Sequence, residues 1–531
     1  MRKRTAGIYA LLLLLLSGAV WRIYTLARAG ATPASEQQAH MTVTVAQGRA
    51  AIYDCNRQKL VNREVALSSC IAPFPSTLTA LSQKLPEAQW KTLSERLSRG
   101  RPVTAVLPEL YTSVRGLWQY MAPVRYTKGQ LAPHLIGYLD SENAHGVTGI
   151  EEALDSYLTA HEGQVKLTFD VDANGRVLEG VEPEVENTMR STQAGVVLTI
   201  DSRVQYAAET VAAKHMQRGA VVILEPKTGR VRAMVSLPAY DPTDVAASLE
   251  QPHAPLLNRA IQNYNCGSVF KIVTAAAALE SGLKPEQNFV CSGSVLIGDR
   301  QFACHNRLGH GTLTMKNAFA QSCNPYFIQL AQQVGGRALY TQAAALGFDS
   351  AVLLADNYQT ARALLPDTDA LSSPGELSNL AIGQGGLLAT PVHIAQLAAA
   401  VYNGGEWVPA TVVQGYTDEN GVYTENEPTA AMRAFSPQTA ATLREFMENA
   451  VRHGTGTTAK PDTGLAGGKT GTAETGWVED GVKVIQSWYA GFFETGGRSY
   501  AIAVVGEDKN RTGVRAAPLF KALCEALAEI P

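Results

Sequence analysis

Two serines within one short stretch each precede a lysine by three positions. In NCGSVFKIVTAAAALESGLK, residues 265–284, the pairs are Ser268 with Lys271 and Ser281 with Lys284. A serine hydroxyl is a weak nucleophile until a neighbouring base takes its proton, and burial lowers the pKa of a lysine enough for it to act as that base. The spacing alone is unspecific, because two common residues three apart recur by chance roughly twice in a chain of this length. The surrounding residues must therefore decide between the two serines.

The two serines differ in their positions relative to a predicted apolar helix. Ser281 follows the helix and precedes Gly282 and Pro285, so it lies where a helix ends and a turn begins. Ser268 instead opens the stretch VFKIVTAAAAL, which places its hydroxyl at a helix N-terminus, where the helix dipole favours developing negative charge. Lys271 lies one turn further on the same face. We therefore predict that Ser268 and Lys271 form the catalytic pair.

Two later motifs supply the groups that such a pair needs for proton relay and substrate binding. AQSCNPYF contains Ser322 and Asn324, separated by one residue. LAGGKTGTAET contains Lys469, Thr470, Gly471 and Thr472 in a glycine-rich stretch, which is typical of an edge strand approached closely by a substrate. Each motif alone could occur by chance. Their occurrence together, in the order Ser-x-x-Lys, Ser-x-Asn and Lys-Thr-Gly-Thr, is more than chance would give.

Second copies of the two later motifs have ordinary structural explanations. Residues 141–143, Ser-Glu-Asn, repeat the Ser-x-Asn pattern, and residues 227–229 repeat Lys-Thr-Gly. The latter fill a predicted hairpin turn, and turn chemistry accounts for them.

The elements around these motifs predict an α+β domain. Residues 195–200 and 219–237 read as strands, the second stretch as a hairpin turned at 226–229. An apolar helix is expected over about 268–280, a hairpin with a Gly-Gly turn over 487–508, and a closing amphipathic helix over 517–530. Strands, then helices, then strands indicate an antiparallel sheet covered by helices. Upstream, helices are expected within 84–100 and 149–163.

Composition narrows the function classes. The chain has 531 residues, of which 46% are hydrophobic and 18% charged, with 45 basic against 48 acidic residues. Such a chain should fold over most of its length into several compact units, and it has no basic excess to attract a polyanion. Nucleic acid is therefore not an expected partner.

The N-terminus predicts export. Arg2, Lys3 and Arg4 precede an uncharged run from Ala6 to Trp21, and positive flanking charge stays on the cytoplasmic side. We favour an uncleaved anchor, with Arg22 snorkelling so that the apolar stretch approaches the ~20 residues that a membrane span requires. The alternative is a signal peptide cleaved near residues 29–31, Ala-Gly-Ala. Both alternatives place the remaining chain outside the cytoplasm.

The seven cysteines fit an oxidising compartment without forming a dense disulfide framework. Their spacing lacks the paired Cys-x-x-Cys or Cys/His pattern of a zinc site, so no metal is expected. Cys291, Cys304 and Cys323 lie within 33 residues, and a disulfide between Cys304 and Cys323 is the pairing we favour. Buried free thiols are the alternative.

With these motifs, the chain resembles the penicillin-binding protein transpeptidases of the high-molecular-weight class B type. The segments VVLTIDSRVQYAAE, NRAIQNYNCGSVFKI and AIGQGGLLATPVHIAQLAAAVYNGG are similar to that domain, and GRAAIYDCNRQKL is similar to the start of the family's N-terminal pedestal. Cys266 stands where the family usually has proline, and Ala50 and Arg57 replace glycines. The resemblance implies the penicillin-binding and serine β-lactamase-like fold, with these regions: cytoplasmic tail 1–5, transmembrane anchor 6–28, linker 29–40, mixed N-terminal pedestal (dimerisation-like) domain 41–190, transpeptidase domain 191–531.

The resemblance also implies the chemistry. Ser268 would attack the penultimate D-alanine carbonyl of a peptidoglycan stem peptide, and Lys271 would accept its proton. Backbone N–H groups of Ser268 and Thr472 would hold the oxyanion. Ser322 would relay a proton, Asn324 would hold Lys271, and Lys469, Thr470 and Thr472 would bind the carboxylate end of the substrate. No cofactor is implied, β-lactams would inhibit, and a membrane glycosyltransferase is the expected partner.

Rival functions are a β-lactamase and a β-lactam sensor with the same catalytic fold. A β-lactamase needs a group that activates water for deacylation. Glu376 and Asn379 are three apart, whereas the serine β-lactamase pattern has a glutamate and an asparagine four apart. The complete motif set argues against a catalytically silent scaffold, and we find no glycosyltransferase signature before residue 190.

Overall fold

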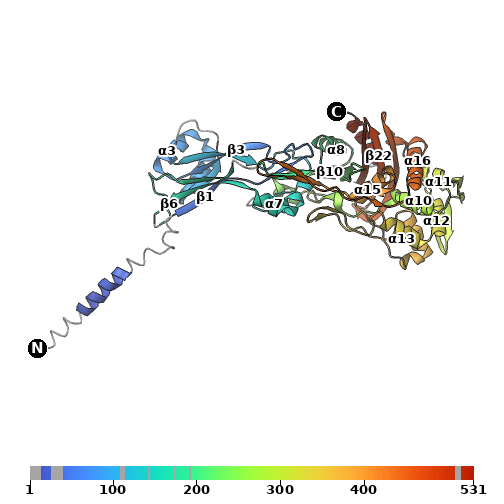
Figure 1. The fold of residues 1–531 in the computed structure, drawn as a ribbon, viewed down its shortest axis with the longest axis horizontal. Helices are drawn as coiled ribbons and strands as arrows, with labels where there is room; N and C mark the ends of the chain where they lie inside the picture. Colours follow the sequence, from blue (N-terminus) through green and yellow to red (C-terminus); the bar gives the residue numbers. More distant parts are fainter. Residues whose placement is uncertain are drawn as a thin grey trace, which may run out of the picture. The chain divides into compact units, whose positions relative to one another are not determined.

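The structure is a computed structural model that describes residues 13–25, 40–107, 114–140, 144–172, 174–189, 193–508 and 516–531 (Figure 1). The expected tail, most of the linker, part of the anchor and the Ser-x-Asn copy at 141–143 lie outside the described residues. Residues 13–25 are helical. In the parts of the chain just given, no helix has both the length and the apolar character needed to cross a bilayer.

Contacts divide the chain into two compact units. Unit 1 comprises residues 1–49, 64–125 and 162–192, and unit 2 comprises 50–63, 126–161 and 193–531. The chain therefore enters unit 2 twice before residue 193. The expected boundary between residues 190 and 191 stays a prediction.

Unit 1 consists of two small antiparallel sheets and a helix pair. Its elements are β1 (His40–Gly48), β3 (Glu64–Ile71), α3 (Pro75–Lys84), α4 (Glu87–Leu97), β4 (Val103–Val106), β5 (Leu117–Val124), β6 (Gly163–Asp170) and β7 (Glu184–Asn187). The strand orders are β1-β6-β7 and β4-β3-β5. Leu81 of α3 and Leu93 and Leu97 of α4 are buried together, as the helical spacing of apolar residues predicts. Trp118 of β5 packs edge-to-face on Phe169 of β6, with ring centroids 5.2 Å apart.

Unit 2 contains the remaining elements. Up to the first motif these are β2 (Ala51–Tyr53), α5 (Pro133–Ile136), α6 (Gly149–Ala153), α7 (Asp155–Ala160), β8 (Gly195–Leu198), α8 (Ser202–His215), β9 (Gly219–Leu224), β10 (Val231–Leu237), α9 (Val245–Leu249), η2 (Arg259–Ile261) and η3 (Gly267–Phe270). The middle of the unit holds α10 (Lys271–Glu280), β11 (Phe289–Cys291), β12 (Ser294–Ile297), β13 (Arg300–Ala303), β14 (Gly311–Leu313), α11 (Met315–Ala320), α12 (Asn324–Val334), α13 (Gly336–Ala344), β15 (Leu353–Ala355), β16 (Tyr358–Gln359), η4 (Ala370–Ser372), α14 (Pro374–Ala381) and α15 (Pro391–Tyr402). The last part holds β17 (Glu406–Trp407), β18 (Val413–Thr417), β19 (Tyr423–Glu425), β20 (Met432–Arg433), α16 (Pro437–His453), η5 (Thr457–Ala459), β21 (Leu465–Glu479), β22 (Val482–Thr495), β23 (Arg498–Asp508) and α17 (Ala516–Ala528).

A five-stranded antiparallel sheet, in the order β10-β9-β23-β22-β21, organises unit 2. Alternate residues of β9 belong to two different cores, because successive side chains of a strand point to opposite faces. Val222 packs in the larger core with Leu397 of α15, whereas Val221 packs with Phe520 of α17 and with α8. The sheet is therefore covered by helices on both faces, with α15 on one face and α8 and α17 on the other (Figure 1).

Helix α10 is buried over most of its length, from Lys271 to Ala278. A helix that is apolar all round belongs inside a domain, and α10 contacts α12, α13 and α16. Because α10 is buried, Lys271 of the first motif lies in the interior of unit 2. Each fully buried large side chain in these cores contributes about 1.5–3 kcal/mol relative to exposure.

Most predicted elements are confirmed, with two differences. The hairpins β9–β10 and β22–β23, the Gly-Gly turn at 496–497 and the closing helix α17 are present. The helix expected within 149–163 is instead two short helices, because the backbone leaves helical geometry at Leu154 (φ −113°, ψ 25°), a buried core residue. The helix expected from residue 268 begins as the 3-10 turn η3 and becomes α-helical only at Lys271.

Candidate active site

Ser268 lies in η3, immediately before α10, and is half-buried. The preceding Gly267 has φ +56°, a conformation that side-chain-bearing residues rarely adopt, and its N–H donates to the carbonyl of Gly383 at 2.9 Å. A Cβ on Gly267 would lie 2.6 Å from the carbonyl oxygen of Thr472 and 3.3 Å from its nitrogen. Glycine is thus required here because the backbone of β21 runs against the serine loop.

The residues before Ser268 are tied to strands β22 and β23. The N–H of Asn265 donates to Gln486 at 3.1 Å, and the indole N–H of Trp488 donates to the carbonyl of Asn265 at 2.8 Å. The hydroxyl of Tyr264 donates to Glu507 at 2.8 Å. The central sheet therefore fixes the loop that carries the serine.

Glu507 is also the centre of a buried ion network. Its two carboxylate oxygens accept from Arg259 at 3.1 Å and from Arg218 at 2.9 Å. The three side chains are only 5–9% exposed. Removing one member of such a network leaves an uncompensated buried charge, which is far more costly than breaking an exposed pair.

We expect Glu507→Ala to lower the free energy of unfolding by about 3–5 kcal/mol, because the buried guanidinium of Arg259 would lose the carboxylate it pairs with and Arg218 would keep only its pair with Glu479 at 2.7 Å. Glu445, which pairs with Lys316 at 2.6 Å on the surface, provides the control, and Glu445→Ala should cost no more than about 1 kcal/mol. Denaturation of the two full-length variants by urea would measure both values. Equal losses in the two variants would contradict a supporting role for the network.

Lys271 connects the first motif with the second. Its side chain is fully buried, and its Nζ donates to the carbonyl of Ser322 at 2.7 Å and to Asn324 Oδ1 at 2.6 Å, with Ser322 Oγ at 3.3 Å. Asn324 in turn donates through Nδ2 to the carbonyl of Ala303 at 3.3 Å. The amide of Asn324 thus holds the lysine in place beneath the serine turn.

Lys469 brings the third motif to the same point. It lies on β21, the edge strand of the sheet as predicted, is fully buried, and donates to Ser322 Oγ at 2.8 Å and to the carbonyl of Thr470 at 3.0 Å. The hydroxyls of Thr470 and Thr455 are hydrogen-bonded at 2.8 Å. Thr455 belongs to none of the three motifs, and its contact with Thr470 is visible only in the fold.

Ser322 is the shared partner of both lysines. It occupies the turn between α11 and α12 with φ +53°, a left-handed conformation that costs a residue with a side chain about 1–2 kcal/mol. The turn aims its hydroxyl at both amines, so that a proton can pass between them through one oxygen. A strained residue held in this way is typical of a functional site.

Burial changes the protonation of both lysines. It lowers the pKa of Lys271 to about 7, against an effect in the opposite direction from nearby Cys323 and Cys304. The pKa of Lys469 is lowered well below its ordinary value by burial and by the neighbouring charge of Lys271. Two close buried amines share their protons, so the pair supplies a neutral amine near neutral pH.

The remaining predicted residues lie as follows. Gly471 is buried and Thr472 exposed on β21, and a Cβ on Gly471 would lie 3.1 Å from Val269 and 3.2 Å from the carbonyl of Cys266. Ser281 is the C-cap of α10 and donates to the carbonyl of Ala277 at 2.7 Å, as expected for a helix end. The second Lys-Thr-Gly, at 227–229, fills the β9–β10 turn.

The expected disulfide between Cys304 and Cys323 is wrong for this structure, in which all seven cysteines are free. Both sulfurs instead lie in a cluster with Cys291 and His310. The spacing argument also missed this cluster, because its members are 13, 6 and 13 positions apart and meet only through the fold.

Residues 219–525 match the family model of the penicillin binding protein transpeptidase domain. The chain belongs to this family. It is 30% identical over 456 residues to penicillin-binding protein PbpB of Mycolicibacterium smegmatis, covering 80% of this chain and 67% of that protein. It is also 30% identical over 371 residues to stage V sporulation protein D of Bacillus subtilis, covering 67% of this chain and 55% of the relative.

Solved structures agree with the family. A chain of a peptidoglycan synthase complex superimposes with a TM-score of 0.70 at 26% identity, covering 99% of this chain and 98% of its own. The resemblance found in the sequence and the predicted fold, an antiparallel sheet covered by helices, are thereby confirmed.

Proposed function

We propose that the protein is a peptidoglycan D,D-transpeptidase that works through an acyl-enzyme on Ser268. Relatives at 33% and 26% identity carry the name peptidoglycan D,D-transpeptidase. The observation that carries the proposal is the meeting of Lys271, Ser322, Asn324 and Lys469 in one hydrogen-bonded network beside the serine turn. Three motifs far apart in the sequence thus supply one nucleophile, one base and one anion-binding group.

In the acylation step, Ser268 Oγ attacks the penultimate D-alanine carbonyl while its proton passes to the neutral amine of Lys271. The developing oxyanion is held by the backbone N–H groups of Ser268 and Thr472, whose chain segments run against each other. The C–N bond then breaks, and the leaving amine of D-alanine takes a proton through Ser322. An acyl ester on Ser268 remains.

The edge strand β21 carries the residues that would bind the substrate. Lys469, Thr470 and Thr472 would bind the terminal carboxylate by charge-assisted and hydroxyl hydrogen bonds. In the second half of the reaction the amine of another stem peptide attacks the ester, the proton returns to Ser268, and an amide cross-link is formed.

We further propose that the chain is held at the cell membrane by its N-terminus, with residues 41–531 outside the cytoplasm. The basic residues at positions 2–4 and the apolar run after them support this placement. A glycosyltransferase that makes the glycan strand is the partner we propose. Its support is the likeness to a chain of a peptidoglycan synthase complex described as coordinating polymerization and crosslinking.

The activity is tested with the full-length protein in detergent. A donor peptide ending in D-Ala-D-Ala and an acceptor amine should yield free D-alanine and a cross-linked product together. A chromogenic β-lactam should give a burst of about one equivalent per chain followed by slow turnover, because the ester persists where no water is activated. Rapid continuous turnover of the β-lactam without peptide cross-linking would favour the β-lactamase alternative.

A further inference from the structure

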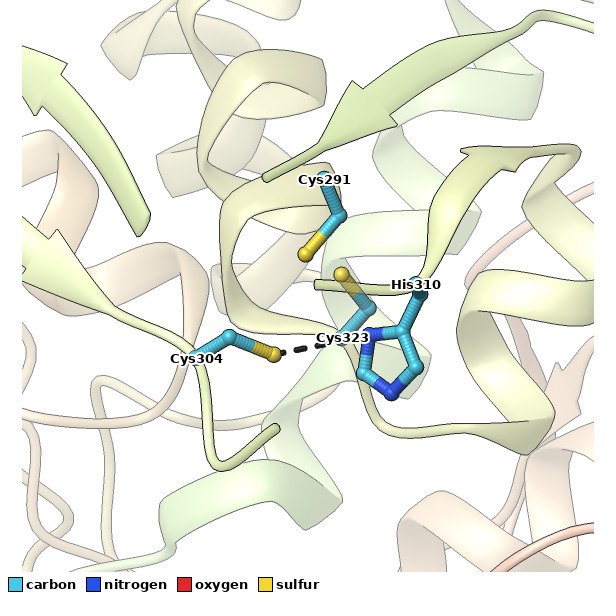
Figure 2. A group of neighbouring side chains, drawn as sticks. All are labelled: Cys291, Cys304, His310 and Cys323. Carbon is cyan, nitrogen blue, oxygen red and sulfur yellow. Dashed lines mark hydrogen bonds between the residues drawn. The ribbon is translucent and has the colours of Figure 1, made fainter. Parts of the chain in front are cut away.

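Three cysteines and one histidine converge beside the catalytic network. The sulfurs of Cys291, Cys304 and Cys323 and a ring nitrogen of His310 all lie within 4.8 Å of one another. Figure 2 shows the three thiols and the imidazole pointing toward a common centre. Cys304 Sγ lies 3.5 Å from His310 Nδ1. The cysteines are buried and the histidine is half-buried.

The donor set matches one type of ion. Zn²⁺ in a closed structural site takes four tetrahedral ligands such as Cys₃His, with Zn–S near ~2.3 Å and Zn–N near ~2.0–2.1 Å. Neighbouring ligand atoms of such a tetrahedron lie about 3.5–3.8 Å apart. The observed separations reach this geometry with small side-chain movements, and soft thiolates with one imidazole favour Zn²⁺ over Mg²⁺ or Ca²⁺.

The four ligands lie in or next to four different elements, and backbone contacts join the segments that carry them. Cys291 ends β11, Cys304 follows β13, His310 precedes β14, and Cys323 is the N-cap of α12. The N–H of His310 donates to the carbonyl of Cys291 at 3.0 Å. The loops carrying Cys291 and His310 touch backbone to backbone, since a Cβ on Gly309 would lie 2.3 Å from the carbonyl oxygen of Cys291.

The charges around the cluster suit a thiolate–metal centre. The N-terminus of α12 favours negative charge on Cys323. Zn²⁺ with three thiolates has a net charge of −1, which the positive end of the α12 dipole partly offsets.

We propose that Cys291, Cys304, His310 and Cys323 bind one Zn²⁺, and that this ion positions the Ser322–Asn324 turn. Cys323 lies between the two motif residues, so a bond from its sulfur fixes the strained turn that places Ser322 Oγ between the two lysines. Cys304 follows Ala303, whose carbonyl accepts from Asn324. The ion thus links Cys323, the neighbour of Asn324, with Cys304, the neighbour of Ala303, and so supports the hydrogen bond between Asn324 and Ala303. Zn²⁺ also keeps three neighbouring thiols from forming disulfides in an oxidising compartment.

Metal content tests the site itself. Full-length protein purified without chelator should contain about one Zn²⁺ per chain by elemental mass spectrometry, whereas Cys304→Ala and His310→Ala should each lose at least tenfold. The controls are Cys524→Ala, a buried cysteine of α17, and His305→Ala, whose Nδ1 lies 3.9 Å from Cys304 Sγ. Both should keep the wild-type content. Less than a tenth of an equivalent in wild-type protein, or loss of zinc in His305→Ala with retention in His310→Ala, would overturn the assignment.

A second measurement avoids variants that fail to fold. Zinc-depleted wild-type protein loaded with Co²⁺ should show thiolate-to-cobalt charge-transfer absorption, absent from Cys304→Ala treated in the same way. A Co²⁺ spectrum without thiolate bands would overturn the ligand set.

The positioning role rests on the proposed function and is tested separately. Removal of zinc by a chelator should slow acylation by a fluorescent penicillin at least tenfold, and Zn²⁺ should restore it. Circular dichroism should be unchanged, because the ion orders one turn rather than the whole unit. Unchanged acylation after zinc loss would refute positioning. Zinc-loaded protein that never acylates would instead refute the proposed function while leaving the metal site intact.

Discussion

Replacing Ser268 with alanine should abolish covalent labelling by a fluorescent penicillin. A β-lactam presents a strained amide in place of the acyl-D-Ala-D-Ala bond, so it traps the same nucleophile as a persistent ester. In wild-type protein, mass spectrometry of a proteolytic digest should place the adduct on the peptide that contains Ser268. Ser268 lies in η3 immediately before α10, whose first residue, Lys271, shares Ser322 with Lys469.

The matched control is the second Ser-x-x-Lys of the same helix. Ser281 caps α10 and donates to its own helix at the carbonyl of Ala277. Ser281→Ala should label at the wild-type rate within about twofold, the range of ordinary surface changes. Circular dichroism of both variants establishes that they are folded. An adduct on Ser281, or undiminished labelling of Ser268→Ala, would show that Ser268 is not the nucleophile.

Local patterns predicted most of the fold that surrounds this serine. The strands of the central sheet are rich in apolar residues, whose side chains pack into a core on each face, and their turns contain glycine. The hairpins β9–β10 and β22–β23 could therefore be located from the residues alone. The helix within 149–163 was predicted as one element because nothing in its spacing marks the break at Leu154. Tertiary packing decided that detail.

Local sequence patterns could not predict that the three motifs meet at one site. Ser268, Ser322 and Lys469 lie on three elements whose contacts are long-range, and only their order in the sequence, compared with a known family, indicated that they meet. The left-handed turn at Ser322 and the approach of β21 to Gly267 are set by neighbours far along the chain. The same holds for the cluster of Cys291, Cys304, His310 and Cys323, whose spacing matches no compact zinc motif.

The acylation rate should depend on pH through the lysine pair. Burial lowers the pKa of Lys271 to about 7, so the neutral amine that takes the proton of Ser268 is formed as pH rises through that value. We expect the second-order rate of penicillin acylation to rise about tenfold per pH unit below 7 and to level off above it. The apparent value belongs to Lys271 and Lys469 together.

The free energy of unfolding should also rise with pH, but at higher pH than the acylation rate does. The ordinary pKa of a lysine is 10.5, so between about 7 and 10.5 the unfolded chain holds a proton that folded Lys271 has released. Stability contributed by this group therefore rises with pH across that window and is lowest below about 7. Circular dichroism at each pH separates a loss of folded protein from a loss of the base.

Replacing Lys271 with alanine should remove the base and slow acylation by about 10²–10⁴-fold, the range for one general base. The adduct should still form on Ser268, because the nucleophile and the oxyanion donors remain, and the rise in rate near pH 7 should disappear. Lys284, the exposed lysine of the second Ser-x-x-Lys, provides the matched control, and Lys284→Ala should keep both the rate and the pH profile. Stopped-flow labelling between pH 5.5 and 9 measures all three proteins. A wild-type profile that is flat across pH 7, or a Lys271→Ala variant that keeps the wild-type rate, would show that another group accepts the serine proton.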